Sequence, residues 1–190
     1  GDGMAATSTR RQKRRERKIK RGVVFGNAKN AGIGMDRGAL RKGVVETLDK
    51  WFPQRRSVDG ETEIKVYMTH SLEELSEAKA ETMREPPPDF VVVIGGDGST
   101  QKTLGEDAEF LSYLTSDPDH AAEVIVLGAG SKNVVPTALK LLGQDPLKAF
   151  DVVCEKFVRG IPRDIICVPL LKINERHGFI YGSGAIVNAL

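Results

Sequence analysis

One stretch near the middle of the chain decides the fold. It reads Phe90-Val91-Val92-Val93-Ile94-Gly95-Gly96-Asp97-Gly98-Ser99-Thr100. Its first five residues form a continuous apolar run, which is typical of a parallel β-strand buried on both faces. The glycines that follow let backbone N–H groups approach an anion without a side chain in the way. We therefore predict a buried strand, a ligand-binding turn and a helix at this point.

The same order of strand, polar loop and helix recurs along the chain. Strand patterns occur at residues 23–25, 64–68 and 124–127. Helical patterns follow at about residues 40–51, 72–78, 104–114, 137–142 and 146–158, and Ser71 with Glu74 predicts a capping box before the second. This alternation predicts an α/β fold, with an open, mostly parallel sheet and helices on both faces.

Three segments of different character predict the domain organisation. Residues 1–21 are polar and basic, and we expect a flexible arm there, with Gly1–Gly3 left over from cloning. Residues 22–160 form the predicted α/β nucleotide-binding domain. Residues 161–190 open a β-rich second domain, in which 165–173 and 178–187 pair as a hairpin. The chain stops in an apolar β segment, and an unpaired apolar edge predicts a fragment of a longer protein.

The charge of the chain is concentrated in the arm. Nine of the 28 Lys and Arg residues and two of the 26 Asp and Glu residues lie within residues 1–21. The remainder has 19 basic and 24 acidic residues, a net charge of −5. No specific nucleic-acid binding is expected of such a body. The arm, Arg10–Arg21, is compatible with contact to an anionic membrane, with a nuclear-localisation or RNA-binding tail, or with a solvated segment.

Several classes of protein are excluded by missing signals. The sequence contains neither the phosphate-binding pattern GxxxxGK[ST] nor the dinucleotide pattern GxGxxG. It has two cysteines, Cys154 and Cys167, and no Cys and His spacing that suits zinc. Its apolar runs are far shorter than a membrane span needs. We therefore expect a cytoplasmic protein, with peripheral membrane association left open.

Polar loops after the predicted strands supply the candidate site. Because the carboxyl ends of parallel strands share one edge of a sheet, we expect these loops to converge on a nucleotide phosphate. Asp97 could bind Mg²⁺ or act as a base. His70 is a weak candidate, because a single histidine is usually structural or solvated. The predicted nucleotide-binding residues are Asn27, Lys29, Thr69, Gly95, Gly96, Asp97, Gly98, Ser99, Thr100, Gly130, Ser131 and Asn133.

These motifs resemble those of the diacylglycerol kinase catalytic-domain family, which includes sphingosine kinase-like lipid kinases. Residues 93–100 resemble its GGDGT signature, residues 26–32 its NPxSG loop, and residues 128–133 its P-x-G-T-x-N loop. The resemblance covers about residues 22–190. It implies the N-terminal nucleotide domain of the diacylglycerol and NAD kinase-like fold.

The resemblance also implies an activity. Family members transfer the γ-phosphoryl group of ATP to a lipid hydroxyl, with Mg²⁺, at a site between two domains. The implied partners are ATP and a lipid at a membrane surface, and the implied catalytic candidate in this chain is Asp97. In this activity the protein mainly positions the reactants and neutralises charge.

The chain departs from the family pattern at several positions. Ala28 and Gly128 stand where the family has Pro, Lys132 replaces a Gly, and Ser replaces the motif Thr at both 99 and 131. Carboxylates that the family takes from its second domain cannot be assigned here. Two alternatives stay open: a small-molecule kinase related to NAD kinases and phosphofructokinases, and a catalytically silent nucleotide- or membrane-binding module.

Overall fold

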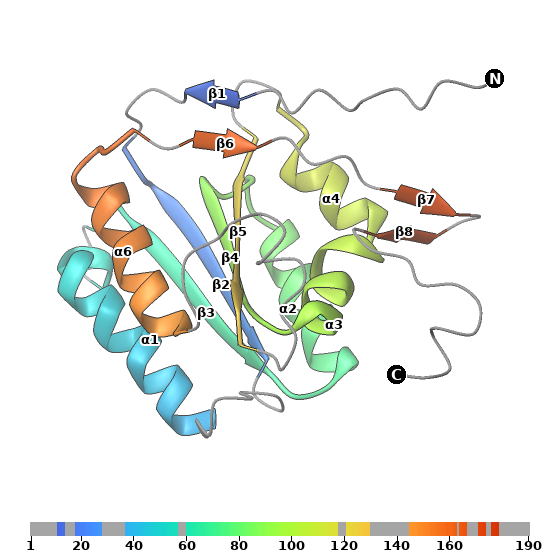
Figure 1. The fold of residues 1–190 in the computed structure, drawn as a ribbon, viewed down its shortest axis with the longest axis horizontal. Helices are drawn as coiled ribbons and strands as arrows, with labels where there is room; N and C mark the ends of the chain where they lie inside the picture. The colour runs from blue at the N-terminus through green and yellow to red at the C-terminus, as the bar shows by residue number, and fades with distance from the viewer. Residues whose placement is uncertain are drawn as a thin grey trace.

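The computed structural model has a four-stranded parallel sheet at its centre, with strand order β3-β2-β4-β5 (Figure 1). The structure describes residues 11–13, 18–27, 37–56, 60–117, 121–129, 145–162, 164–166, 171–173 and 176–178. The sheet strands are β2 (Arg21–Asn27), β3 (Glu63–Thr69), β4 (Phe90–Gly95) and β5 (Glu123–Gly128). The predicted parallel α/β fold is therefore confirmed.

Alternating side chains of the two central strands enter two separate cores. Val24 of β2 and Val92 of β4 belong to one hydrophobic cluster, whereas Val23 and Val91 belong to the other. All four are fully buried. Because a strand directs successive side chains to opposite faces, a strand that is apolar throughout must be covered on both faces.

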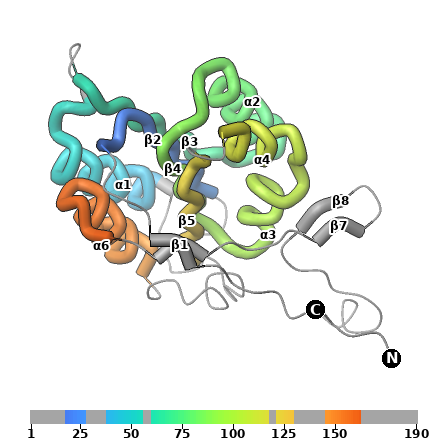
Figure 2. The backbone as a smooth tube through the Cα atoms, turned by 90° about the horizontal axis from the view of Figure 1, so that it is seen from above, coloured from blue at the N-terminus to red at the C-terminus, as the bar shows by residue number. Residues whose placement is uncertain are grey.

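Helices cover both faces of the sheet (Figure 2). Helices α1 (Arg37–Trp51) and α6 (Pro146–Val158) pack on one face, and α2 (Leu72–Met83) and α4 (Ala108–Leu114) on the other. A short 3₁₀ helix, η1 (Pro53–Arg56), follows α1. Helix α6 matches its predicted bounds because Asp145 caps its N-terminus through the N–H groups of Leu147 and Lys148.

The segment after the glycine-rich turn differs from the single helical stretch that we predicted. It consists of α3 (Asp97–Thr100), the π-helix η2 (Gln101–Gly105) and α4. The break occurs where Asp107 accepts a hydrogen bond from the N–H of Phe110, 2.9 Å away, and so starts a new helix. Apolar spacing alone could not locate this break, because Leu104 and Phe110 enter the same core on either side of it.

Short strands among the first and last described residues form small antiparallel pairs. Strand β1 (Arg11–Lys13) pairs with β6 (Asp164–Ile166), and β7 (Leu171–Ile173) pairs with β8 (Arg176–Gly178). The expected hairpin of 165–173 with 178–187 is therefore wrong in its first strand, which is split between two partners.

The expected boundary of the arm also shifts. Ile19 is buried, and Arg21 already belongs to β2, where the Asp89 carboxylate accepts hydrogen bonds from the N–H groups of Lys20 and Arg21. The sheet thus includes Arg21, which we assigned to a flexible arm, and the arm itself contains β1. The helix predicted at 137–142 lies outside the described residues.

Candidate functional site

Three predicted site residues end neighbouring strands of the sheet. Asn27 is the last residue of β2, Thr69 of β3 and Gly95 of β4. In the strand register Asn27 lies opposite Thr69, and Gly95 lies opposite Gly128, the last residue of β5. The carboxyl edge of the sheet therefore collects polar groups from strands that are distant in sequence, as the loop pattern predicts.

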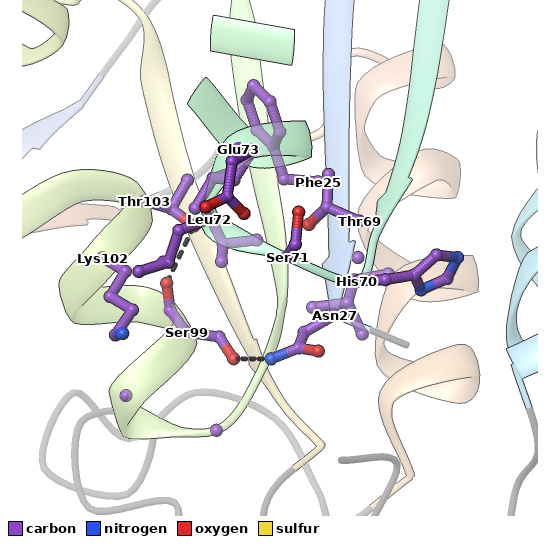
Figure 3. Close-up of a pocket in the computed structure, with 16 residues that line it drawn as sticks. Phe25, Asn27, Thr69, His70, Ser71, Leu72, Glu73, Ser99, Lys102 and Thr103 are labelled. Carbon is purple, nitrogen blue, oxygen red and sulfur yellow. Dashed lines mark hydrogen bonds between the residues drawn. The ribbon is translucent and has the colours of Figure 1, made fainter. Parts of the chain in front are cut away.

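A short side-chain hydrogen bond joins the end of β2 to the glycine-rich turn that follows β4. The Asn27 amide Nδ2 donates to Ser99 Oγ at 2.5 Å (Figure 3). The backbone of Ser99 is held as well, because the Thr103 hydroxyl donates to the Ser99 carbonyl at 2.8 Å. The structure thus brings together the first polar loop and the glycine-rich turn.

The absence of a side chain at Gly95 is what allows Ser99 to fold back over β4. A Cβ at Gly95 would lie 2.7 Å from the Ser99 Cβ and 3.0 Å from its Oγ. Such distances are too short for non-bonded atoms, so Ser99 would have to move away from Asn27. Gly98 is different, because a Cβ there would meet nothing within 4 Å. Its open side is available for the close approach of a ligand.

The remaining residues of the turn differ in how far they are exposed. Thr100 is buried, and its hydroxyl and its N–H both donate to the Gly96 carbonyl, at 3.2 Å and 3.0 Å. Thr100, which we predicted to bind nucleotide, therefore faces the fold. Gly96 has an extended backbone with φ −82° and ψ −179°, a conformation open to any residue. Asp97 is half-buried at the first position of α3.

A cavity of about 530 Å³ lies between the strand ends and the helices (Figure 3). Five predicted residues line it: Asn27, Thr69, Gly96, Gly98 and Ser99. The other lining residues are Phe25, Gly26, His70, Ser71, Leu72, Glu73, Leu75, Val93, Ile94, Lys102 and Thr103. Its volume falls within the usual range of small-molecule sites. The cavity has an apolar side and a polar side at the Asn27–Ser99 bond.

The wall opposite the glycine-rich turn is fixed by the N-terminus of α2. Ser71 Oγ accepts from the N–H of Glu74 at 3.1 Å, as the capping box predicts. The Glu74 carboxylate returns to the N–H of His70 at 2.7 Å, one residue earlier than the usual capping box. The His70 imidazole points away from Asn27 and Ser99 in Figure 3. This wall therefore has a defined shape before any ligand binds.

Four of the predicted site residues lie outside the described residues: Lys29, Gly130, Ser131 and Asn133. The third polar loop nevertheless starts beside the turn, because the Ala129 N–H donates to the Gly95 carbonyl at 2.9 Å.

The sequence did not predict that the start of α2 would line the cavity, nor that the cation Lys102 would. Leu72, Glu73, Lys102 and Thr103 all line the cavity without belonging to a recognised motif. Thr103 and Lys102 could have been found from helical spacing, since they follow Ser99 by four and three residues. Leu72 and Glu73 gave no signal beyond their position after a predicted cap.

The described residues offer little for a metal. They contain no group of three or more His, Cys, Asp or Glu side chains that could hold an ion. Asp97 is the one carboxylate of the glycine-rich turn. Since Mg²⁺ is commonly held by one or two carboxylates together with substrate phosphates and water, this donor fits part of such a site. Asp97 would then help to hold Mg²⁺ beside bound phosphates.

Comparison with known proteins places the chain in a family. A family model described as the diacylglycerol kinase catalytic domain matches residues 42–163, which include the glycine-rich turn and Thr69. The chain belongs to the diacylglycerol kinase catalytic-domain family. The resemblance inferred from three loops is thereby confirmed, although the first loop, with Asn27 and Lys29, precedes the matched range.

Solved structures agree with this membership at the level of the fold. Three structures of proteins assigned as diacylglycerol kinases from Bacillus anthracis str. Sterne match with TM-scores of 0.52, 0.51 and 0.52, each at 16% identity. Each match covers 74% of this chain, but only 43%, 40% and 41% of the respective relative. The chain thus spans about two fifths of these proteins. The comparison with curated proteins gives no match.

No described helix is both long and apolar enough to cross a membrane.

Proposed function

We propose that this chain is the nucleotide-binding part of a lipid kinase, which transfers the γ-phosphoryl group of ATP to the hydroxyl of a diacylglycerol or sphingoid-type lipid. The observation that carries the proposal is the hydrogen bond from Asn27 to Ser99 at the carboxyl edge of the sheet, in a chain that belongs to a kinase family. Parallel α/β sheets bind their ligands at this edge.

The cavity suits the two parts of a nucleotide. Phe25, Leu75 and Val93 provide apolar surface for a base, and the glycine-rich turn provides hydroxyl and N–H groups for phosphates. We assign Asn27, Gly96, Gly98 and Ser99 to phosphate binding and Thr69 to the opposite side of the cavity. Gly95 and Thr100 support the turn without lining the cavity. Lys29, Gly130, Ser131 and Asn133 remain proposed nucleotide ligands.

Phosphoryl transfer requires positioning and neutralisation of charge more than covalent catalysis by the protein. Mg²⁺, where bound, neutralises charge on the phosphates. Asp97 is the proposed carboxylate at the turn, with either a metal-positioning role or the role of base toward the lipid hydroxyl. The lipid itself is proposed to bind outside the described residues. The basic segment Arg10–Arg21, except the buried Arg21, is proposed to contact an anionic membrane at the cytoplasmic face.

A transfer assay tests the reaction class and its acceptor. The chain is incubated with radiolabelled Mg-ATP and one of four acceptors: diacylglycerol or sphingosine in mixed micelles, NAD, or a sugar phosphate. Label in a lipid supports the proposal. Label in NAD or the sugar phosphate favours the small-molecule kinase. Binding of ATP without transfer, both by this chain and by a longer protein that spans the full length of the relatives, favours a catalytically silent module.

A further inference from the structure

Lys102 occupies a place at the cavity that no motif accounts for. It comes from η2, three residues after Ser99, and its exposed side chain lines the cavity on the side of Ser99 that faces away from Asn27 (Figure 3). It also lines a second, smaller cavity of about 280 Å³, which shares Leu72 and Leu75 with the first. Lys102 therefore stands at the junction of two hollows on the same side of the sheet.

A buried lysine of α2, Lys79, holds the backbone at Lys102 in place. Lys79 of α2 has a side chain only 8% exposed, and its ammonium lies 2.7 Å from the Asp107 carboxylate. The same ammonium donates to the carbonyl of Lys102 at 3.3 Å. Burying a charge is costly unless it is paired and hydrogen-bonded, so this arrangement fixes η2 against α2. Lys102 is thus presented from a rigid wall.

Lys102 has no ion-pair partner among the described residues, although Glu106 lines the smaller cavity together with it. The acidic side chain that lines the larger cavity, Glu73, comes from the start of α2 instead of the segment that carries Ser99 (Figure 3). A phosphate bound in the larger cavity would therefore have both the Ser99 hydroxyl and the Lys102 ammonium among the groups that line it.

We infer that Lys102 binds a phosphate group of the nucleotide, and so supplies from the protein part of the charge neutralisation that phosphoryl transfer needs. The inference rests on the proposed function, which it deepens by adding a ligand outside the recognised loops. A phosphate group suits both a lysine ammonium and a serine hydroxyl, because each can donate a charge-assisted hydrogen bond to a phosphate oxygen. A phospholipid headgroup offers the same chemistry, and the test must separate the two sources.

Calorimetric titrations of the full chain provide the test. The ligands are Mg-ATP, magnesium tripolyphosphate, adenosine and a short-chain phosphatidic acid, each at two salt concentrations. The variants are Lys102→Gln, which removes the charge, Lys102→Arg, which keeps it, and the control Lys148→Gln, which alters an exposed lysine on α6 across the sheet. Thermal unfolding of each variant verifies the fold.

We expect Lys102→Gln to weaken Mg-ATP and tripolyphosphate by about tenfold to a hundredfold, and to reduce the salt dependence of their binding. Adenosine binding should be unchanged, and Lys102→Arg and Lys148→Gln should match the parent. Equal binding of ATP by parent and Lys102→Gln overturns the inference while leaving the proposed function intact. An equal loss for adenosine, or a loss confined to phosphatidic acid, also overturns it. A parent chain that binds none of the four ligands removes both proposals.

Discussion

Two glycines of the same turn should respond to an added methyl group in opposite ways. Gly95→Ala places a Cβ 2.7 Å from the Ser99 Cβ, so either Ser99 or β4 must shift. Overpacking of this kind costs about 1–3 kcal/mol. Gly98→Ala places its Cβ where nothing lies within 4 Å. Because Gly98 is helical, alanine there should be neutral or stabilise the fold by up to about 1 kcal/mol.

The two variants should differ in thermal stability, although both should bind Mg-ATP more weakly than the parent. Gly95→Ala should lower the melting temperature by roughly 2–12 °C and weaken Mg-ATP, because Ser99 leaves Asn27. Gly98→Ala should keep or raise the melting temperature and still weaken Mg-ATP by about tenfold, because its methyl group occupies the space that we assign to the ligand. Thermal unfolding and calorimetric titration measure the two effects. A Gly98→Ala variant that is as stable as the parent and binds Mg-ATP equally well would refute the assignment of Gly98 to the ligand surface.

The remaining predictions concern three other features. Asn27→Ala should lower the free energy of unfolding by about 1 kcal/mol through loss of the hydrogen bond to Ser99, measured by urea denaturation, and weaken Mg-ATP several-fold. A hydrogen bond to Glu85, against some desolvation, raises the pKa of Lys65 from 10.5 to about 12. Its stabilisation is complete below about pH 10.5 and is lost as the pH rises through 12. Because solvent screens a pair at the surface, Lys65→Met should remove at most about 1 kcal/mol of that alkaline fall in stability. An unchanged fall contradicts the ion pair. Burial raises the pKa of the Cys154 thiol to about 12, so in a Cys167→Ser variant a thiol reagent should label Cys154 only after unfolding. Rapid labelling of the folded variant would show that Cys154 is accessible.

The central sheet could be predicted from the sequence because its signals are local. The continuous run at 90–94 can be buried on both faces only in a covered sheet, and the cap residue Ser71 marks where a helix begins. The convergence of Asn27 with the glycine-rich turn followed from the rule that parallel strands end at one edge.

Other features depend on contacts between distant residues, which no local pattern reveals. The pairing of β1 with β6 joins residues 11–13 to 164–166, and polar composition suggested only a flexible arm. The Asp107 carboxylate, which caps α4, also pairs with the ammonium of Lys79, far away on α2. We predicted that Thr100 binds the nucleotide because its hydroxyl follows the glycine motif. In the structure that hydroxyl donates to the Gly96 carbonyl instead.

The most direct test of the account is an amide NMR titration of the chain with Mg-ATP, run in parallel with Gly96→Val. The Gly96 backbone is extended, so valine fits its conformation while adding bulk to the cavity. We predict that ATP shifts the amide signals of the 95–100 turn and the side-chain amide of Asn27, leaves the opposite edge of the sheet at Asp89 unchanged, and shifts nothing in the folded Gly96→Val variant. Shifts that avoid the turn, or that persist in the variant, would contradict a nucleotide site at the carboxyl edge of the sheet.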